Sequence, residues 1–159
     1  MSTTTTGSQS LDAVIERMLN GATIAEAAGI DGRDIEAGYA LAHSLYSARN
    51  YPGAESVFRA LCLHDHMDER FWMGLAGCRQ AAGDTAGAID AYAFAAYAGS
   101  LGDPVPVLHG GLCHLKLGAV DIAKGMFEAA SAMGAPENAA HAEARKKAQR
   151  LLASLTTEG

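Results

Sequence analysis

The fold is decided by residues 69–102, which read ERFWMGLAGCRQAAGDTAGAIDAYAFAAYAGSLG. Ala54 and Phe58 precede Ala88 and Tyr92 of this stretch by 34 positions, and Ala123 follows Ala88 by 35. The same two shifts carry Leu41-Ala42 onto Leu75-Ala76 and Gly110-Gly111, Leu61 onto Ala95 and Ala130, and Tyr92 onto Phe127. The extra residue falls in a Gly/Pro-rich link, residues 99–104, where an insertion costs little. The chain therefore contains three copies of one unit.

A period of about 34 residues is typical of the tetratricopeptide repeat, a pair of antiparallel helices. The period places one alanine of each unit where the second helix crosses the first, and a bulky side chain there would force the helices apart. It places one large aromatic residue of each unit in the groove between successive units. Gly83 and Gly118 follow the first helices of units two and three, as expected of glycines that end a helix.

We therefore expect an all-α superhelix of three helix-turn-helix repeats, with capping helices at the N-terminal and C-terminal ends. The repeats are placed at residues 35–68, 69–102 and 104–137, and the C-terminal capping helix at residues 138–155. Residues 10–34 form an N-terminal helical region whose apolar stripe, from Leu11 to Leu19, either caps the stack or pairs with a second copy. Residues 1–9 are expected to be a disordered tail.

The first helices of such repeats line the concave side of the superhelix. The inward positions that we expect to bind a client peptide are Tyr39, His43, Tyr46, Arg70, Met73, Gly77, Gln80, Leu108 and Leu112. This groove is apolar and aromatic, and it lacks the cluster of Lys and Arg residues that grips a free carboxylate. An extended peptide with hydrophobic anchors fits it better. A packing role is the alternative, with Tyr39 and Tyr46 against the N-terminal helix and Leu112 against the C-terminal cap.

Composition and charge exclude several other functions. The formal net charge of −6 argues against a nucleic-acid partner, and no apolar run is long enough to insert in a membrane. The N-terminus has no secretory signal pattern, and Cys62, Cys78 and Cys113 fit free thiols in a reducing compartment. Hence we expect an intracellular protein.

No residues identify a catalytic centre, a metal site or a cofactor site. His64, His66 and the acidic residues beside them resemble a metal cluster, but they fall in the loop that joins the first two repeats. Catalytic use of Cys62 would need a partner histidine, and nothing local identifies one. We therefore expect neither an enzyme nor a cofactor.

One stretch is more specific than a generic repeat. Residues 60–81, ALCLHDHMDERFWMGLAGCRQA, together with Tyr39-Ala-Leu-Ala42 and the segment from Asn50-Tyr51 to Phe58, resemble the class II chaperones of bacterial type III secretion systems. The resemblance extends from about Leu11 to Ala130 and is strongest between Tyr39 and Tyr97. The chain departs from the family pattern at Gly110-Gly111, which leaves the identity of the client open.

The resemblance implies a function. Members of this family keep two hydrophobic, pore-forming translocator proteins soluble in the bacterial cytoplasm before export, and each client presents an extended segment to the concave groove. They are commonly homodimers through N-terminal elements. Carried over to this sequence, the resemblance places Tyr39, His43, Tyr46, Met73 and Gln80 in the client groove. The alternative is a generic tetratricopeptide adaptor within a protein complex.

Overall fold

The computed structural model describes residues 11–22 and 31–157. Within these ranges it contains eight helices and no strand, so the predicted all-α fold is confirmed. The helices are α1 (Leu11–Leu19), α3 (Gly32–Ser47), α4 (Tyr51–His64), α5 (Glu69–Ala81), α6 (Thr85–Ala98), α7 (Pro104–Lys116), α8 (Val120–Ala132) and α9 (Ala139–Thr157). The predicted disordered tail, residues 1–9, and part of the predicted N-terminal region, residues 23–30, lie outside the described residues.

Local sequence signals define the ends of the helices. Asp31, Asp68 and Asp103 begin α3, α5 and α7, and the side chain of each accepts a hydrogen bond from the backbone N–H two residues later. Gly83 and Gly118 follow α5 and α7 with φ of +86° and +78°, a conformation that glycine adopts without steric cost. The turns within repeats two and three are therefore encoded where the repeat pattern predicts them.

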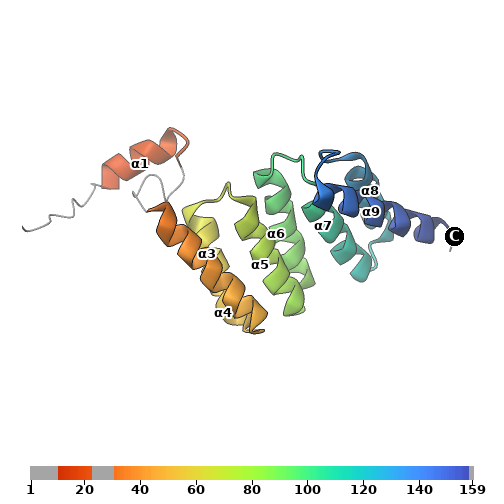
Figure 1. Cartoon of the computed structure of the whole chain (residues 1–159), viewed down its shortest axis with the longest axis horizontal. Helices are drawn as coiled ribbons and strands as arrows, with labels where there is room; N and C mark the ends of the chain where they lie inside the picture. The colour runs from red at the N-terminus through yellow and green to blue at the C-terminus, as the bar shows by residue number, and fades with distance from the viewer. Residues whose placement is uncertain (1–10, 23–30, 158–159) are drawn as a thin grey trace, which may run out of the picture.

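The helices stack as antiparallel pairs, α3 with α4, α5 with α6 and α7 with α8, and α9 closes the row (Figure 1). Each helix from α3 onward packs mainly against the next one along the chain, and α7 also contacts α9. The helix α1 lies apart from the stack (Figure 1). No helix in the described part of the chain is long and apolar enough to cross a membrane.

Small residues make the close approach of these helices possible. Ala54, Ala88 and Ala123 are completely buried at the crossings within the three pairs. The aromatic positions of the repeat, Phe58, Tyr92 and Phe127, are also buried, as the period predicts. Because protein interiors are packed as densely as organic crystals, an alanine at each crossing leaves the adjacent ring its space.

The core divides into two clusters along the stack. The first joins repeats one and two and includes Phe58, Phe71 and Tyr92. The second joins repeat three to α9 and includes Phe127, Ala144, Ala148 and Leu108. The C-terminal helix therefore covers the apolar end of repeat three, which is the role predicted for residues 138–155.

Candidate functional site

A pocket of about 420 Å³ opens on the concave side between α3 and α5. Its lining residues are Tyr39, His43, Tyr46, Phe58, Glu69, Arg70, Met73, Gly74, Gly77 and Asp103. Two first helices of successive repeats thus form opposite walls, and a residue of the second helix of repeat one, Phe58, forms the floor. Asp103, which precedes α7, extends the lining toward repeat three.

Aromatic rings in edge-to-face contact hold the floor and one wall in place. The ring of Tyr39 meets the ring of His43 at 4.6 Å and that of Phe58 at 6.1 Å between centroids, both edge to face. Further along α3, Tyr46 meets Tyr51 at 5.3 Å. Such pairs restrict the rotamers of the rings, so the pocket keeps its shape without an occupant.

On the α5 side of the pocket, two glycines leave space that a side chain would occupy. A Cβ atom at Gly74 would collide with the ring of Phe58, so only glycine allows the ring to pass under the helix. A Cβ at Gly77 would meet the Tyr46 ring at 3.7 Å, an ordinary contact, and would extend into the pocket. Gly74 is thus required by packing, whereas Gly77 leaves open space for a ligand.

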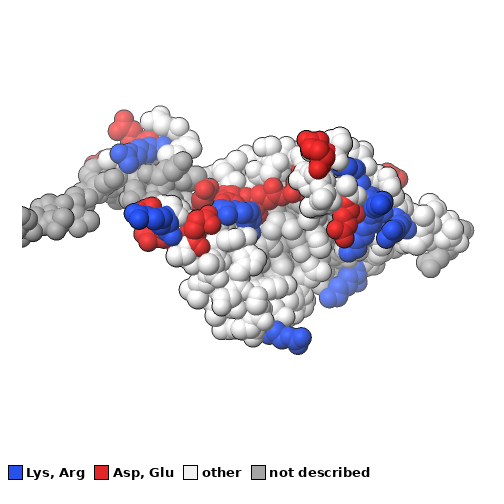
Figure 2. All heavy atoms as spheres, in the orientation of Figure 1, with Lys and Arg blue, Asp and Glu red and all other residues white. Residues whose placement is uncertain are grey.

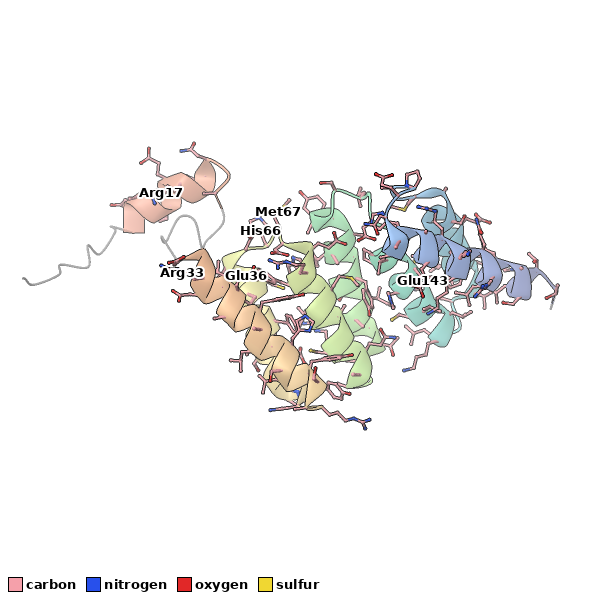
Figure 3. All side chains as sticks on the ribbon, viewed as in Figure 1. Arg17, Arg33, Glu36, His66, Met67 and Glu143 are labelled. Atoms are coloured by element: carbon pink, nitrogen blue, oxygen red, sulfur yellow. The ribbon has the colours of Figure 1, made fainter. Side chains whose placement is uncertain are left out.

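Among the described residues that line this pocket, Arg70 is the one lysine or arginine, and it is held by two carboxylates. Its Nη2 lies 2.7 Å from Glu36 Oε1 on α3 and 2.7 Å from Asp68 Oδ2 at the start of α5. Figure 3 shows Glu36 on α3. The guanidinium carbon of Arg70 also lies over the Tyr39 ring, 4.8 Å from its centroid. This network joins repeats one and two across the mouth of the pocket.

Glu69, which precedes Arg70 on α5, and Asp103 also line the pocket. The negative charge of Asp103 beside Glu69 disfavours ionisation of the Glu69 carboxyl group. Burial, together with the negative charges of Asp103 and Asp68, raises the pKa of Glu69 to about 7. The side chain lies against Gly99, where a Cβ would collide with Glu69. A partly buried acidic pair therefore bounds an otherwise apolar cavity.

The structure brings together six of the nine residues predicted to bind a client peptide: Tyr39, His43, Tyr46, Arg70, Met73 and Gly77. The other three lie elsewhere. Gln80 Oε1 accepts a hydrogen bond from the Tyr92 hydroxyl at 2.6 Å. Leu108 is only 3% exposed and Leu112 is partly buried, both in the cluster formed with α8 and α9. Leu108 and Leu112 pack because α9 lies against α7 and α8.

Sequence reasoning missed Phe58, Gly74, Glu69 and Asp103 as pocket residues. Phe58 occupies the repeat position that packs between units, and one edge of its ring nevertheless faces the cavity. Glu69 is the first residue of repeat two and Asp103 directly precedes repeat three, so both lie where a first helix begins. Their position in the repeat was the available signal.

The comparisons with known proteins agree with one another. Low calcium response locus protein H of Yersinia pestis is 37% identical over 125 residues, covering 77% of this chain and 74% of that protein. The translocator chaperone SycD of Yersinia enterocolitica superposes with a TM-score of 0.77 at 31% identity, covering 84% of this chain and 98% of that chain. This chain belongs to the type III secretion translocator chaperones.

Two further solved structures extend the comparison. A type III secretion complex from Aeromonas hydrophila gives a TM-score of 0.83 at 31% identity, covering 92% of this chain and 97% of that chain. PcrH of Pseudomonas aeruginosa, solved with the chaperone binding region of PopD, gives 0.75 at 33% identity, covering 82% and 96%. SycD has also been solved as an alternative dimer. No protein-family model matches the chain. The family predicted from residues 60–81 is confirmed.

The cysteines of the chaperone are packed thiols. Cys62, Cys78 and Cys113 are free and buried. Burial raises the pKa of the Cys62 thiol to about 12 and that of Cys78 to about 11. Because the thiolate is the nucleophilic form, these groups are poor nucleophiles near neutral pH.

Hydrogen bonds of its own residues account for the conformation of the loop between α4 and α5. Asp65 Oδ1 accepts from the backbone N–H of Met67 at 3.0 Å, and the indole N–H of Trp72 donates to the carbonyl of His66 at 2.9 Å. Figure 3 shows His66 and Met67 at this turn. No group of three metal-binding side chains occurs among the residues that the structure describes.

Proposed function

We propose that this chaperone binds hydrophobic translocator proteins of a type III secretion system in the bacterial cytoplasm and keeps them soluble before export. An extended client segment occupies the pocket between α3 and α5. The observation that carries the proposal is the preformed apolar cavity of about 420 Å³ with an aromatic floor. A globular domain fills such a space with its own side chains unless the space receives a partner.

The chemistry of the pocket favours apolar anchors. Burial of one Leu or Phe side chain contributes roughly 1.5–3 kcal/mol. Ordering an extended segment opposes this gain, so two or three anchors give a complex of moderate affinity. Moderate affinity suits a client that has to be released for export. The complex of PcrH with the chaperone binding region of PopD supports this mode of binding.

We also propose that the chaperone dimerises through α1. Ile15 and Leu19 of this helix are 45% and 83% exposed, and the helix lies apart from the stack (Figure 1). The alternative dimer of SycD supports self-association in the family. Sedimentation of wild type and Leu19→Asp tests this proposal, with a shift toward monomer expected for the variant. An unchanged dimer would place the interface elsewhere.

Co-expression tests the client function. The full chain is co-expressed with the large hydrophobic proteins encoded beside its gene, and the soluble material is purified through the chaperone. A stoichiometric complex is expected with wild type and a weakened one with Tyr46→Ala. Tyr97→Ala is the matched control, because Tyr97 is exposed but lies on α6 outside the pocket.

Two outcomes would contradict the proposal. If no neighbouring protein becomes soluble, the chain is an adaptor for other partners. If a complex forms and survives Tyr46→Ala as well as it survives Tyr97→Ala, the client binds another surface.

A further inference from the structure

The lining of the client pocket contains two carboxyl groups, those of Glu69 and Asp103, for one guanidinium group. Arg70 contributes the single positive charge of the lining, and its guanidinium already contacts Glu36 and Asp68 at 2.7 Å each. Glu69 and Asp103 therefore receive no compensation from Arg70. Figure 2 shows acidic atoms gathered along this edge of the face, whereas basic atoms gather over the C-terminal helices.

The remaining neighbour of the acidic pair supplies little charge. His141 on α9 places Nε2 3.5 Å from Asp103 Oδ1. Its Nδ1 accepts a hydrogen bond from the backbone N–H of Ala135 at 3.0 Å. Asp103 itself caps α7 through the backbone N–H of Val105 at 2.7 Å. Among the residues that the structure describes, no ion pair joins either carboxyl group to a lysine or an arginine.

The position of Glu69 and Asp103 in the pocket indicates which kind of client group would bind them. Both carboxyl groups line the same cavity as Tyr39 and Met73, so a group bound to them lies within one or two residues of an apolar anchor on an extended segment. A cation there would favour the ionised form of Glu69, because it stabilises both carboxylates at once. An acidic or neutral flank would leave the repulsion between the carboxyl groups in place.

We propose that the client segment carries a lysine or arginine beside its apolar anchor, and that this cation binds between Glu69 and Asp103. The inference rests on the proposed function, since it specifies the chemistry of the segment in the same pocket. The apolar anchor supplies most of the affinity, and the cation selects which segment of a long hydrophobic client binds and in which direction it runs.

Ionisation of Glu69 makes binding depend on pH. The groups that face it are Asp68 on its own helix, Asp103 before α7 and, beyond Asp103, His141 on α9. Above pH 7 the pair carries two negative charges and attracts the cation fully. At pH 6 Glu69 holds its proton, consistent with its raised pKa, and the attraction is reduced.

The experiment uses the full chain and overlapping 15-residue fluorescent peptides that cover the translocator recovered by co-expression. The peptide that binds best is then remade with each lysine or arginine replaced by norleucine. One replacement is expected to weaken binding about fivefold for wild type and clearly less for Glu69→Gln, which keeps only Asp103. Glu128→Gln, an exposed carboxylate on α8 with the same change in net charge, should behave as wild type.

The possible failures are distinguishable. A peptide that binds wild type, loses affinity with Tyr46→Ala and is indifferent to every norleucine replacement would overturn this inference and leave the proposed function standing. Equal loss on replacement in wild type and Glu69→Gln would also overturn it. If no peptide binds, the client function in this pocket fails, and the inference fails with it.

Discussion

Three glycine-to-alanine substitutions distinguish a pocket position from a core position by their effects on stability and on client binding. Gly74 and Gly77 lie on α5 and Gly125 lies within α8, so each change adds a methyl group inside a helix. Alanine favours a helix over glycine by roughly 0.8–1.0 kcal/mol. The surroundings differ: the Phe58 ring blocks a methyl at position 74, Tyr46 stands 3.7 Å from one at position 77, and nothing lies within 4 Å at position 125.

The expected free energies of unfolding follow from these contacts. Gly125→Ala and Gly77→Ala should each gain about 1 kcal/mol, which raises Tm by roughly 2–4 °C in a chain of this size. Gly74→Ala gains the same propensity but displaces Phe58, and overpacking costs about 1–3 kcal/mol. Its net change should be a loss of up to about 2 kcal/mol.

Client binding should follow a different order. Gly77→Ala narrows the cavity and should weaken binding at least about threefold although the protein becomes more stable. Gly125→Ala should bind as wild type does. Urea unfolding followed by circular dichroism gives the stabilities, and fluorescence polarisation with the client peptide gives the affinities.

Each variant can refute one part of the reasoning. If Gly77→Ala binds the client as tightly as Gly125→Ala does, the pocket between α3 and α5 is not the client site. If Gly74→Ala is as stable as Gly125→Ala, Phe58 does not pack beneath α5 as described. A Gly77→Ala protein that is destabilised would mean that Tyr46 is less able to accommodate the methyl group than a 3.7 Å contact implies.

Three further predictions concern the core and the acidic pair. Tyr39→Ala should lower the free energy of unfolding by about 2 kcal/mol as well as weaken client binding, because Tyr39 packs on Phe58; chemical denaturation checks the first effect and peptide titration the second. Ala88→Leu should lower Tm through a loss of about 1–3 kcal/mol, whereas Ala86→Leu on the exposed side of α6 should not. A raised carboxyl pKa means that the folded protein binds its proton more tightly than the unfolded chain, so the contribution of Glu69 to stability falls as pH rises toward 7. The gain in Tm of Glu69→Gln over wild type should therefore be larger at pH 8 than at pH 6, and an equal gain would contradict the raised pKa.

The repeat period predicts the helices because the residues that recur with it are those that the packing and the turns of the helices require. An alanine at a helix crossing and a glycine at a turn are each required by local geometry, so Ala88 and Gly83 mark their elements without knowledge of the rest of the chain. The six predicted residues that line the pocket lie on α3 and α5. The same rule places Leu108 in the groove, and the structure instead buries it.

That difference has a physical cause. A solenoid must cover its last apolar face, and α9 does so by packing on both α7 and α8. Positions that form an open groove in repeats one and two therefore become core in repeat three. The sequence shows that residues 138–155 can form a helix, but the surface that the helix covers depends on the direction in which it leaves the stack. The acidic pair poses a similar problem, because Glu69 and Asp103 come from separate repeats and meet only through the curvature of the whole array.

Phe58 belongs both to the core and to the pocket, so it connects the stability of the chaperone to its function. Its ring is 1% exposed and belongs to the first core cluster, yet its edge forms the floor of the client pocket. Tyr39 packs against this ring and lines the same cavity, so a client anchor in the pocket extends the core rather than lying on a separate surface. Binding to the folded state alone adds stability in proportion to the logarithm of client concentration, about 2.7 kcal/mol at one hundred times Kd. Under the proposed function, the client-free chaperone is therefore the less stable form, and a client anchor in the pocket between α3 and α5 would complete the packing of repeats one and two.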